Sequence, residues 1–107
     1  MKELLGFFTT DLKEIYRVPN GKVVKLENIN IVNADTVAHQ VSIYISNPAI
    51  EPEKAPIFKV NTPIEAGGFI RDTDGYVLNS GCVILVKCAA APVAKTLSYA
   101  MFGSDLN

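Results

Sequence analysis

The sequence predicts an all-β protein: a single-domain antiparallel β-sandwich of about eight strands, wound as a Greek key or jelly roll. Two observations lead to this prediction. Short apolar segments alternate with polar residues at a period of two, and turn residues interrupt them about every eight to twelve positions. In addition, 107 residues of which 49% are hydrophobic suit one packed core, so we expect residues 1–107 to form one domain.

Three segments in the first half of the chain have the alternation of strands. Residues 13–18 form a short candidate that stops at the Pro19-Asn20-Gly21 turn. Residues 23–33 form the longest one, and their apolar parity changes at Glu27-Asn28, which indicates a β-bulge or a passage between sheets. Residues 40–46 alternate regularly, as in a half-buried antiparallel strand. Residues 1–10 fit a helix, a strand or an N-terminal arm.

The second half begins with a proline-rich segment, residues 47–63, which holds four of the six prolines. Because proline cannot donate to a strand ladder, we expect a long connection or an edge there, with one brief strand at 57–60. Such a connection suits a Greek-key crossover between two sheets. Asp74-Gly75 predicts a hairpin before Tyr76. Residues 82–90, apolar on both faces, and 95–102 complete the predicted strands.

The charge balance argues against nucleic acid as a partner. Ten basic and eleven acidic residues give a net charge of −1, and the basic residues are scattered among acids. Proteins that bind duplexes usually carry a basic excess on one face. No apolar run approaches the roughly 20 residues that span a bilayer, and the N-terminus lacks the pattern of a signal peptide. We therefore expect synthesis in the cytoplasm and no membrane partner.

The residues that could carry chemistry have simpler structural explanations. Cys82 and Cys88 are six residues apart in one predicted strand, too far for a disulfide and poorly spaced for zinc, so we expect both to be buried. His39 is the only histidine, and we expect it to be structural or solvated rather than a catalytic base. Paired carboxylates at 51 and 53 and at 72 and 74 suit a solvated rim and a turn. We assign no catalytic, cofactor-binding or metal-binding residue and expect no enzyme.

Two kinds of binding surface remain. Exposed tyrosines on a sandwich can stack on sugar rings, so a carbohydrate-binding site is an alternative, with candidates Tyr44, Asp72, Asp74 and Tyr76. The sequence also holds more apolar residues than one small core absorbs, which predicts self-association unless the chain ends pack on their own core. The candidate interface residues are Leu4, Leu5, Phe7, Phe8, Val83, Leu85, Phe102 and Leu106.

The order of several motifs resembles the small virion structural proteins of tailed bacteriophages, which include head-decoration (cement) and tail accessory proteins. The motifs run from about residue 15 to 101: Pro19-Asn20-Gly21-Lys22, Ile29-Asn30-Ile31-Val32-Asn33, Val41-Ser42-Ile43-Tyr44-Ile45, Ile64-Glu65-Ala66-Gly67-Gly68, Leu78-Asn79-Ser80-Gly81 and Leu97-Ser98-Tyr99. Two features depart from the family pattern: Cys82 stands where relatives often have an acid, and 47–63 is unusually long.

The resemblance implies a role in the virion. It implies a β-sandwich subunit, often trimeric, that binds the major capsid protein lattice or another virion component without catalysis. The predicted function is therefore capsid decoration and stabilisation by an oligomer. The carbohydrate alternative becomes, in this setting, a receptor-binding module of a phage tail.

Overall fold

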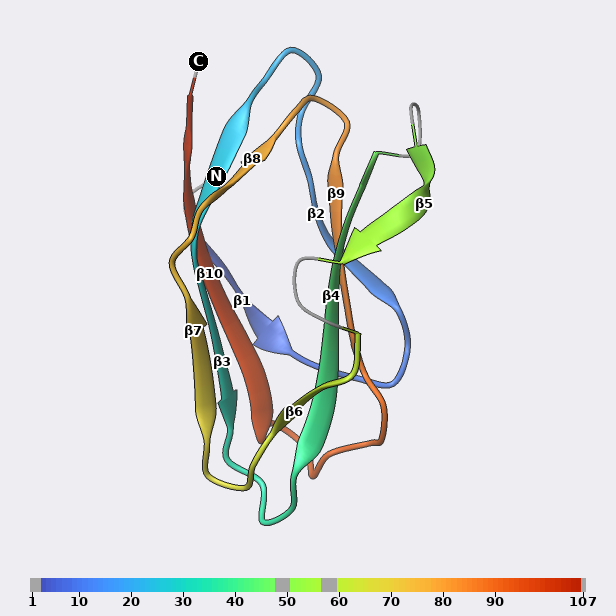
Figure 1. Ribbon diagram of the computed structural model, residues 1–107, viewed down its shortest axis with the longest axis vertical. Coiled ribbons are helices and arrows are strands. Elements are labelled where there is room, and N and C mark those ends of the chain that lie inside the picture. Colours follow the sequence, from blue (N-terminus) through green and yellow to red (C-terminus); the bar gives the residue numbers. More distant parts are fainter. Residues whose placement is uncertain (1–2, 48–50, 57–59, 107) are drawn as a thin grey trace.

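The computed structural model describes residues 3–47, 51–56 and 60–106, and for 51–56 it describes the backbone alone. These residues form an all-β sandwich, as predicted (Figure 1). The strands in chain order are β1 (Glu3–Phe7), β2 (Lys13–Arg17), β3 (Val24–Asn33), β4 (His39–Asn47), β5 (Glu51–Pro56), β6 (Thr62–Ile64), β7 (Phe69–Asp72), β8 (Tyr76–Leu78), β9 (Val83–Cys88) and β10 (Leu97–Asp105).

The strands form two antiparallel sheets. The first sheet has the order β1-β10-β3-β7, with β8 also paired to β3; the second has the order β2-β9-β4-β5, with β6 also paired to β4. Since β7 and β8 share β3, and β5 and β6 share β4, each sheet has four strand positions. The chain alternates between the sheets at most connections, which is the order of a jelly roll. The eight positions agree with the predicted strand count.

A bulge in β3 explains the change of parity that the sequence shows at Glu27-Asn28. Phe102 of β10 lies opposite Asn28, but the next residue, Gly103, lies opposite Leu26. Glu27 is therefore the extra residue, and Leu26 and Ile29 both face the core on either side of it. Because of this bulge, one long strand keeps its apolar side buried over ten residues.

The described strands of the proline-rich segment, β5 and β6, form an edge beside β4, which agrees with the edge that was one of the two expectations, but the crossover between sheets predicted at 47–63 was wrong. β5 and β6 both pair with β4 at the edge of the second sheet. An edge strand tolerates proline because no further strand needs a hydrogen bond from its outer side. The chain crosses to the first sheet only after β6, through residues 65–68. Of the brief strand predicted at 57–60, residues 57–59 lie outside the described residues, and Val60 lies in a turn.

The predicted hairpin at Asp74-Gly75 was also wrong. β7 and β8 do not pair with each other; both run antiparallel to β3, one after the other along its length. Gly75 has a φ of 82°, a conformation that glycine adopts readily, and it interrupts a single strand position instead of reversing the chain. A positive φ is thus common to hairpins and to this kind of break, and the sequence alone does not distinguish them.

The core lies between the inner faces of the two sheets. Its fully buried side chains include Leu26, Ile29, Ile31 and Met101 from the first sheet and Ile43, Ile84 and Val86 from the second. Residues 3–7, whose structure the sequence left open, form an edge strand beside β10. The core and this pairing fix which side chains of the first sheet face outward.

Candidate interaction surface

The edge strand β1 places two large apolar side chains on the outer face of the first sheet. Side chains alternate along a strand, so Leu4 and Gly6 face the core while Leu5 and Phe7 face outward. Leu5 is 64% exposed, and Phe7 is also exposed. Gly6 lies opposite Tyr99 of β10, whose ring covers it from the core side.

The neighbouring strands continue this apolar face. Phe102 on β10, Val32 on β3 and Phe69 on β7 are exposed, and Phe69 is 72% exposed. The strand register places Phe7, Val32 and Phe69 in one row across the sheet, with Ser98 between the first two. We call the outward-facing side chains of β1, β10, β3 and β7 the first-sheet face; its large apolar members are Leu5, Phe7, Val32, Phe69 and Phe102, and Val77 of β8 is exposed on the same side of the sheet.

The apolar area of the first-sheet face lies in the range of the largest patch on a typical monomer. A fully exposed aromatic side chain presents roughly 200 Å², so the five exposed apolar residues together present on the order of 500 Å². The largest apolar patch of a typical monomer is about 300–600 Å² and is often functional. Water contact over this area is unfavourable, and burial against a partner removes it.

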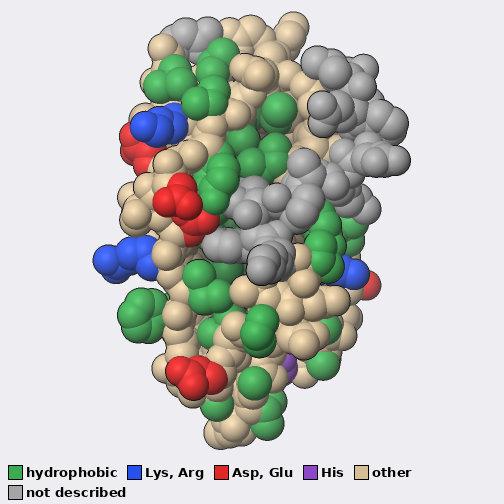
Figure 2. All heavy atoms as spheres, in the orientation of Figure 1, with side chains coloured by type: hydrophobic (Ala, Val, Ile, Leu, Met, Phe, Trp, Pro, Cys, Tyr) green, Lys and Arg blue, Asp and Glu red, His purple; other side chains and the backbone are tan. Residues whose placement is uncertain are grey.

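Charged side chains of both signs flank the apolar residues of this sheet: Lys25 lies outward beside Val77, and Glu27 Oε1 accepts from the Ser104 hydroxyl at 3.3 Å. Arg71 of β7 faces outward, and its Nε donates to Oδ1 of Asn30 at 3.0 Å. Glu3 stands at the opposite edge, on β1. Figure 2 shows charged side chains of both signs mainly along the side of the molecule on which Figure 1 draws the first sheet. The surface is therefore suited to an apolar contact that a few charges orient.

Of the residues that the sequence suggested for an interface, some are exposed in the structure and others are buried. Leu5, Phe7, Phe102 and Leu106 are exposed, as expected. Phe8 is 2% exposed, because the chain turns inward after β1 and its ring packs edge-on against Tyr99, with ring centroids 5.5 Å apart. For Phe8, therefore, the expectation of surplus surface does not hold, and Leu4 packs partly on the same core.

The remaining interface candidates, Val83 and Leu85, lie on β9 of the second sheet. Val83 is 3% exposed and Leu85 is half-buried, although both alternate with the core-facing Ile84 and Val86. The two apolar faces predicted for this strand are thus largely covered within the monomer, and Val83 offers no free surface. Sequence reasoning missed Val32 and Phe69. The alternation Ile29, Ile31 already places Val32 outward, but Phe69 requires knowledge of which strand β7 joins.

The candidates for a sugar site do not all come together. Asp72, Asp74 and Tyr76 lie around the break between β7 and β8: the Tyr76 hydroxyl donates to Asp72 Oδ2 at 2.5 Å, and the Asp74 N–H donates to Asp72 Oδ1 at 2.9 Å. Burial, then the hydrogen bond and charge of Asp72 and the charge of Asp74, raise the pKa of Tyr76 to about 12. Tyr44 lies on β4 of the second sheet, opposite Leu85.

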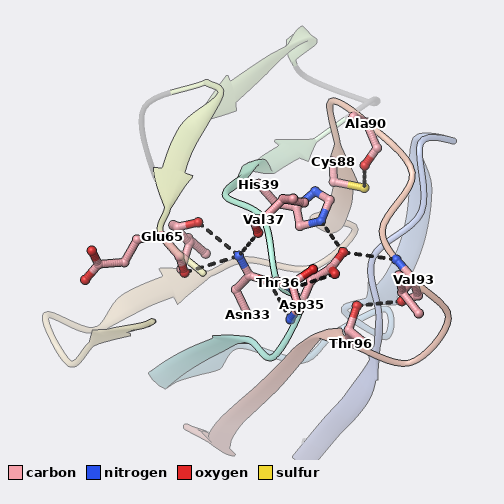
Figure 3. A network of polar contacts seen from close by, with 11 residues as sticks. Asn33, Asp35, Thr36, Val37, His39, Glu65, Cys88, Ala90, Val93 and Thr96 are labelled. Atoms are coloured by element: carbon pink, nitrogen blue, oxygen red, sulfur yellow. Dashed lines mark hydrogen bonds and ion pairs between the residues drawn. The ribbon is translucent and has the colours of Figure 1, made fainter. Parts of the chain in front are cut away.

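A buried polar network ties together the loops at the end of the sandwich drawn at the bottom of Figure 1. Figure 3 shows Nε2 of His39 beside Asp35 Oδ2, at 2.7 Å, and the Val93 N–H donating to the same oxygen at 3.1 Å. Asn33, fully buried, donates to the carbonyls of Val37, Ile64 and Glu65. The network thereby fastens three separate connections, and it explains why the polar run after β3 folds inward.

His39 is a buried member of this network. The residue is 5% exposed, and its Nδ1 is buried without a hydrogen-bond partner among the described residues. No described hydroxyl or thiol is therefore placed to give a proton to that nitrogen, as a nucleophile in a triad must. Hydrogen bonds from His39, Val93 and Thr36 lower the pKa of Asp35, which favours its charged form.

The remaining chemical candidates are placed as follows. Cys82 and Cys88 are buried and unbridged, as predicted, and burial raises the pKa of the Cys88 thiol. Within residues 3–47, 51–56 and 60–106, no three His, Cys, Asp or Glu side chains are grouped so that they could hold a metal ion. The same part of the chain contains no helix with the length and apolar character needed to cross a membrane.

An open pocket of about 330 Å³ adjoins the first-sheet face at Phe7. It lies between the β1–β2 and β9–β10 connections, and its lining includes Phe8, Pro92, Ala94 and Leu97. Comparison of the chain with models of known protein families gives no match, and comparison with curated protein sequences gives none either.

Proposed function

We propose that this chain is a non-catalytic structural protein of a tailed-bacteriophage particle, which decorates and stabilises the capsid by binding as an oligomer to the major capsid protein lattice. The observation that carries the proposal is the first-sheet face, an exposed apolar surface on a rigid sandwich. The motif order that resembles small virion proteins supplies the setting, and it implies self-association, often as a trimer.

The jelly-roll winding supports this reading at the level of fold. Viral capsid domains use this architecture, although lectins and cupins also do, so the fold alone selects no function. The physical mechanism is linkage: a protein that binds only the assembled lattice stabilises that assembly, by an amount that grows with the logarithm of its free concentration above the dissociation constant. The subunit would then be found in the virion after synthesis in the cytoplasm of the bacterial host.

The test is cosedimentation of the purified chain with heads assembled from the major capsid protein of the same genome. We expect saturable binding and a higher melting temperature of the decorated heads. The control is an unrelated jelly-roll domain of similar mass, which should remain in the supernatant. Failure to bind heads, and absence of the chain from purified virions by mass spectrometry, would overturn the proposal.

A second candidate, a receptor-binding module of a phage tail, is favoured by one observation. Asp72, Asp74 and Tyr76 cluster at one place on the surface, and carboxylates beside a tyrosine suit sugar hydroxyls. A glycan array tests it: saturable binding that Asp74→Ala abolishes supports the candidate, and an array without binding refutes it. Tyr44, on the other sheet, should be dispensable for such binding.

A further inference from the structure

We propose that the first-sheet face packs against the same face of a second copy, around a two-fold axis that runs along the strands. This inference rests on the proposed function, because it names the partner of the surface described there. It also replaces the trimer that the resemblance implies with a pair. Four observations support it: the arrangement of the rows, the aromatic residues at their ends, the position of two charges and the area of the face.

The strand register arranges the outward side chains of the first sheet in rows; three of them cross β1, β10, β3 and β7, and a fourth, of Ser104, Lys25 and Val77, lies beyond them toward β8. The first row holds Phe7, Ser98, Val32 and Phe69; the second holds Leu5, Ala100, Asn30 and Arg71; and the third holds Glu3, Phe102 and Asn28. Aromatic side chains therefore stand at both ends of the first row, on the two edge positions of the sheet.

A two-fold axis between β10 and β3 exchanges the two edges of the sheet. It lays β1 of one copy over β7 of the other, so Phe7 meets Phe69 of the second copy, and the contact occurs twice. Aromatic pairs of this kind contribute beyond the area that they bury. An axis across the strands, centred on the second row, would instead lay Glu3 over Phe7, placing a carboxylate on an aromatic ring.

The charges of the three rows agree with the same axis. Glu3 is their only acid and Arg71 their only base among the described residues, and they stand on opposite edge strands of one copy. Within a chain they are too far apart to pair. The axis lays Arg71 of the second copy over Leu5, along which its aliphatic stem can pack, and brings it to within two residues, about 7 Å along the strand, of Glu3. These rim pairs would contribute mainly to orientation.

The area of the face is adequate for a specific pair. A standard interface buries about 800 Å² on each partner. The five apolar side chains supply on the order of 500 Å², and the polar and small residues of the rows supply most of the remainder. Two sheets packed face to face at about 10 Å also form an ordinary arrangement for jelly-roll and sandwich proteins.

Sedimentation velocity and native mass spectrometry test the pair in the wild-type chain. We expect a species of twice the chain mass of 11.6 kDa. Phe69→Glu should abolish it without loss of fold, because that side chain is already exposed. The matched control is Val37→Glu, at a position in the β3–β4 connection that is 54% exposed and lies off the first-sheet face; it should leave the pair intact.

Charge reversal tests the axis itself. Glu3→Arg and Arg71→Glu should each weaken the pair about tenfold, since each creates two like-charge contacts per dimer. The two substitutions together should restore the wild-type affinity, which only an intermolecular contact explains. A monomeric wild-type chain at high concentration, a trimer that Phe69→Glu leaves unchanged, or singles that the double variant does not rescue would each overturn the inference. A monomer that still binds heads would overturn the pair alone, whereas a pair that binds no heads would overturn the proposed function alone.

Discussion

Replacement of Gly6 by alanine should loosen the edge strand that carries half of the aromatic contacts on the first-sheet face. A Cβ at this position would lie 2.7 Å from Cζ of Tyr99 and closer still to its hydroxyl oxygen. Carbon atoms pack best at about 3.5–4.0 Å, so β1 or the ring must move by about 1 Å. The ring has little freedom, because it is 7% exposed and packs against Phe8.

The magnitude follows from two opposing effects. Overfilling a packed site typically costs about 1–3 kcal/mol, whereas alanine in place of glycine in a strand gains roughly 0.5–1 kcal/mol. We therefore expect Gly6→Ala to lower the free energy of unfolding by about 1–2 kcal/mol. For a domain of this size that change lowers the melting temperature by on the order of 5–10 °C. Circular dichroism melts and urea titrations measure both quantities.

A double variant separates the clash from other effects of the substitution. In a Tyr99→Leu background the space above residue 6 is open, so Gly6→Ala should become neutral or stabilising there. This change of sign is the signature of an aromatic ring that covers a strand glycine. A Gly6→Ala variant as stable as the wild type in the presence of Tyr99 would refute the reasoning.

Three further predictions concern the polar groups. Asp35→Asn should lower the melting temperature at neutral pH, and the difference from the wild type should shrink below about pH 4. A carboxyl whose folded-state pKa is depressed contributes stability above its unfolded-state pKa and loses that contribution as pH falls through its folded-state pKa. An equal difference in acid would contradict this prediction. Because the folded-state pKa of Tyr76 is raised to about 12, the free energy of unfolding should fall as pH rises from about 10 to 12. Tyr76→Phe should remove part of that loss, which denaturation curves measure while the phenolate absorbance follows the titration. Asn33→Ala, which leaves the buried carbonyl of Ile64 and the part-buried carbonyls of Val37 and Glu65 without their donor, should cost about 2–4 kcal/mol in urea denaturation, and a cost below 1 kcal/mol would show that water replaces the amide.

Alternation along the chain was enough to predict the sandwich. The parity of Ile29 and Ile31 against Leu26 even located the bulge, because a buried side must stay buried on both sides of an inserted residue. Turn residues were less informative. Asp74-Gly75 fits a hairpin and a strand break equally well, and the choice depends on β3, which is distant in sequence.

The candidate surface was predictable only where one strand is sufficient to define it. Leu5 and Phe7 alternate with residues that pack inward, but the position of Phe69 beside them depends on a register between strands that are far apart in the chain. The same limit explains Phe8 and Val83, whose apolar side chains suggested surface and whose burial arises from packing across the sandwich. The buried network of Asn33, Asp35 and His39 gave no local signal, since its partners come from three separate loops.

The antiparallel pairing of β1 with β10 sets Glu3 opposite Phe102, so the first strand begins at the end of the molecule where the last one finishes (Figure 1). A linker of a few residues should therefore be able to close the chain into a ring, and new ends could be opened at the Asn20–Gly21 turn without cutting either sheet. The new ends of such a permuted chain would lie near Val23, whose carbonyl accepts from the Leu106 N–H, and thus at the end of the sandwich where β10 finishes.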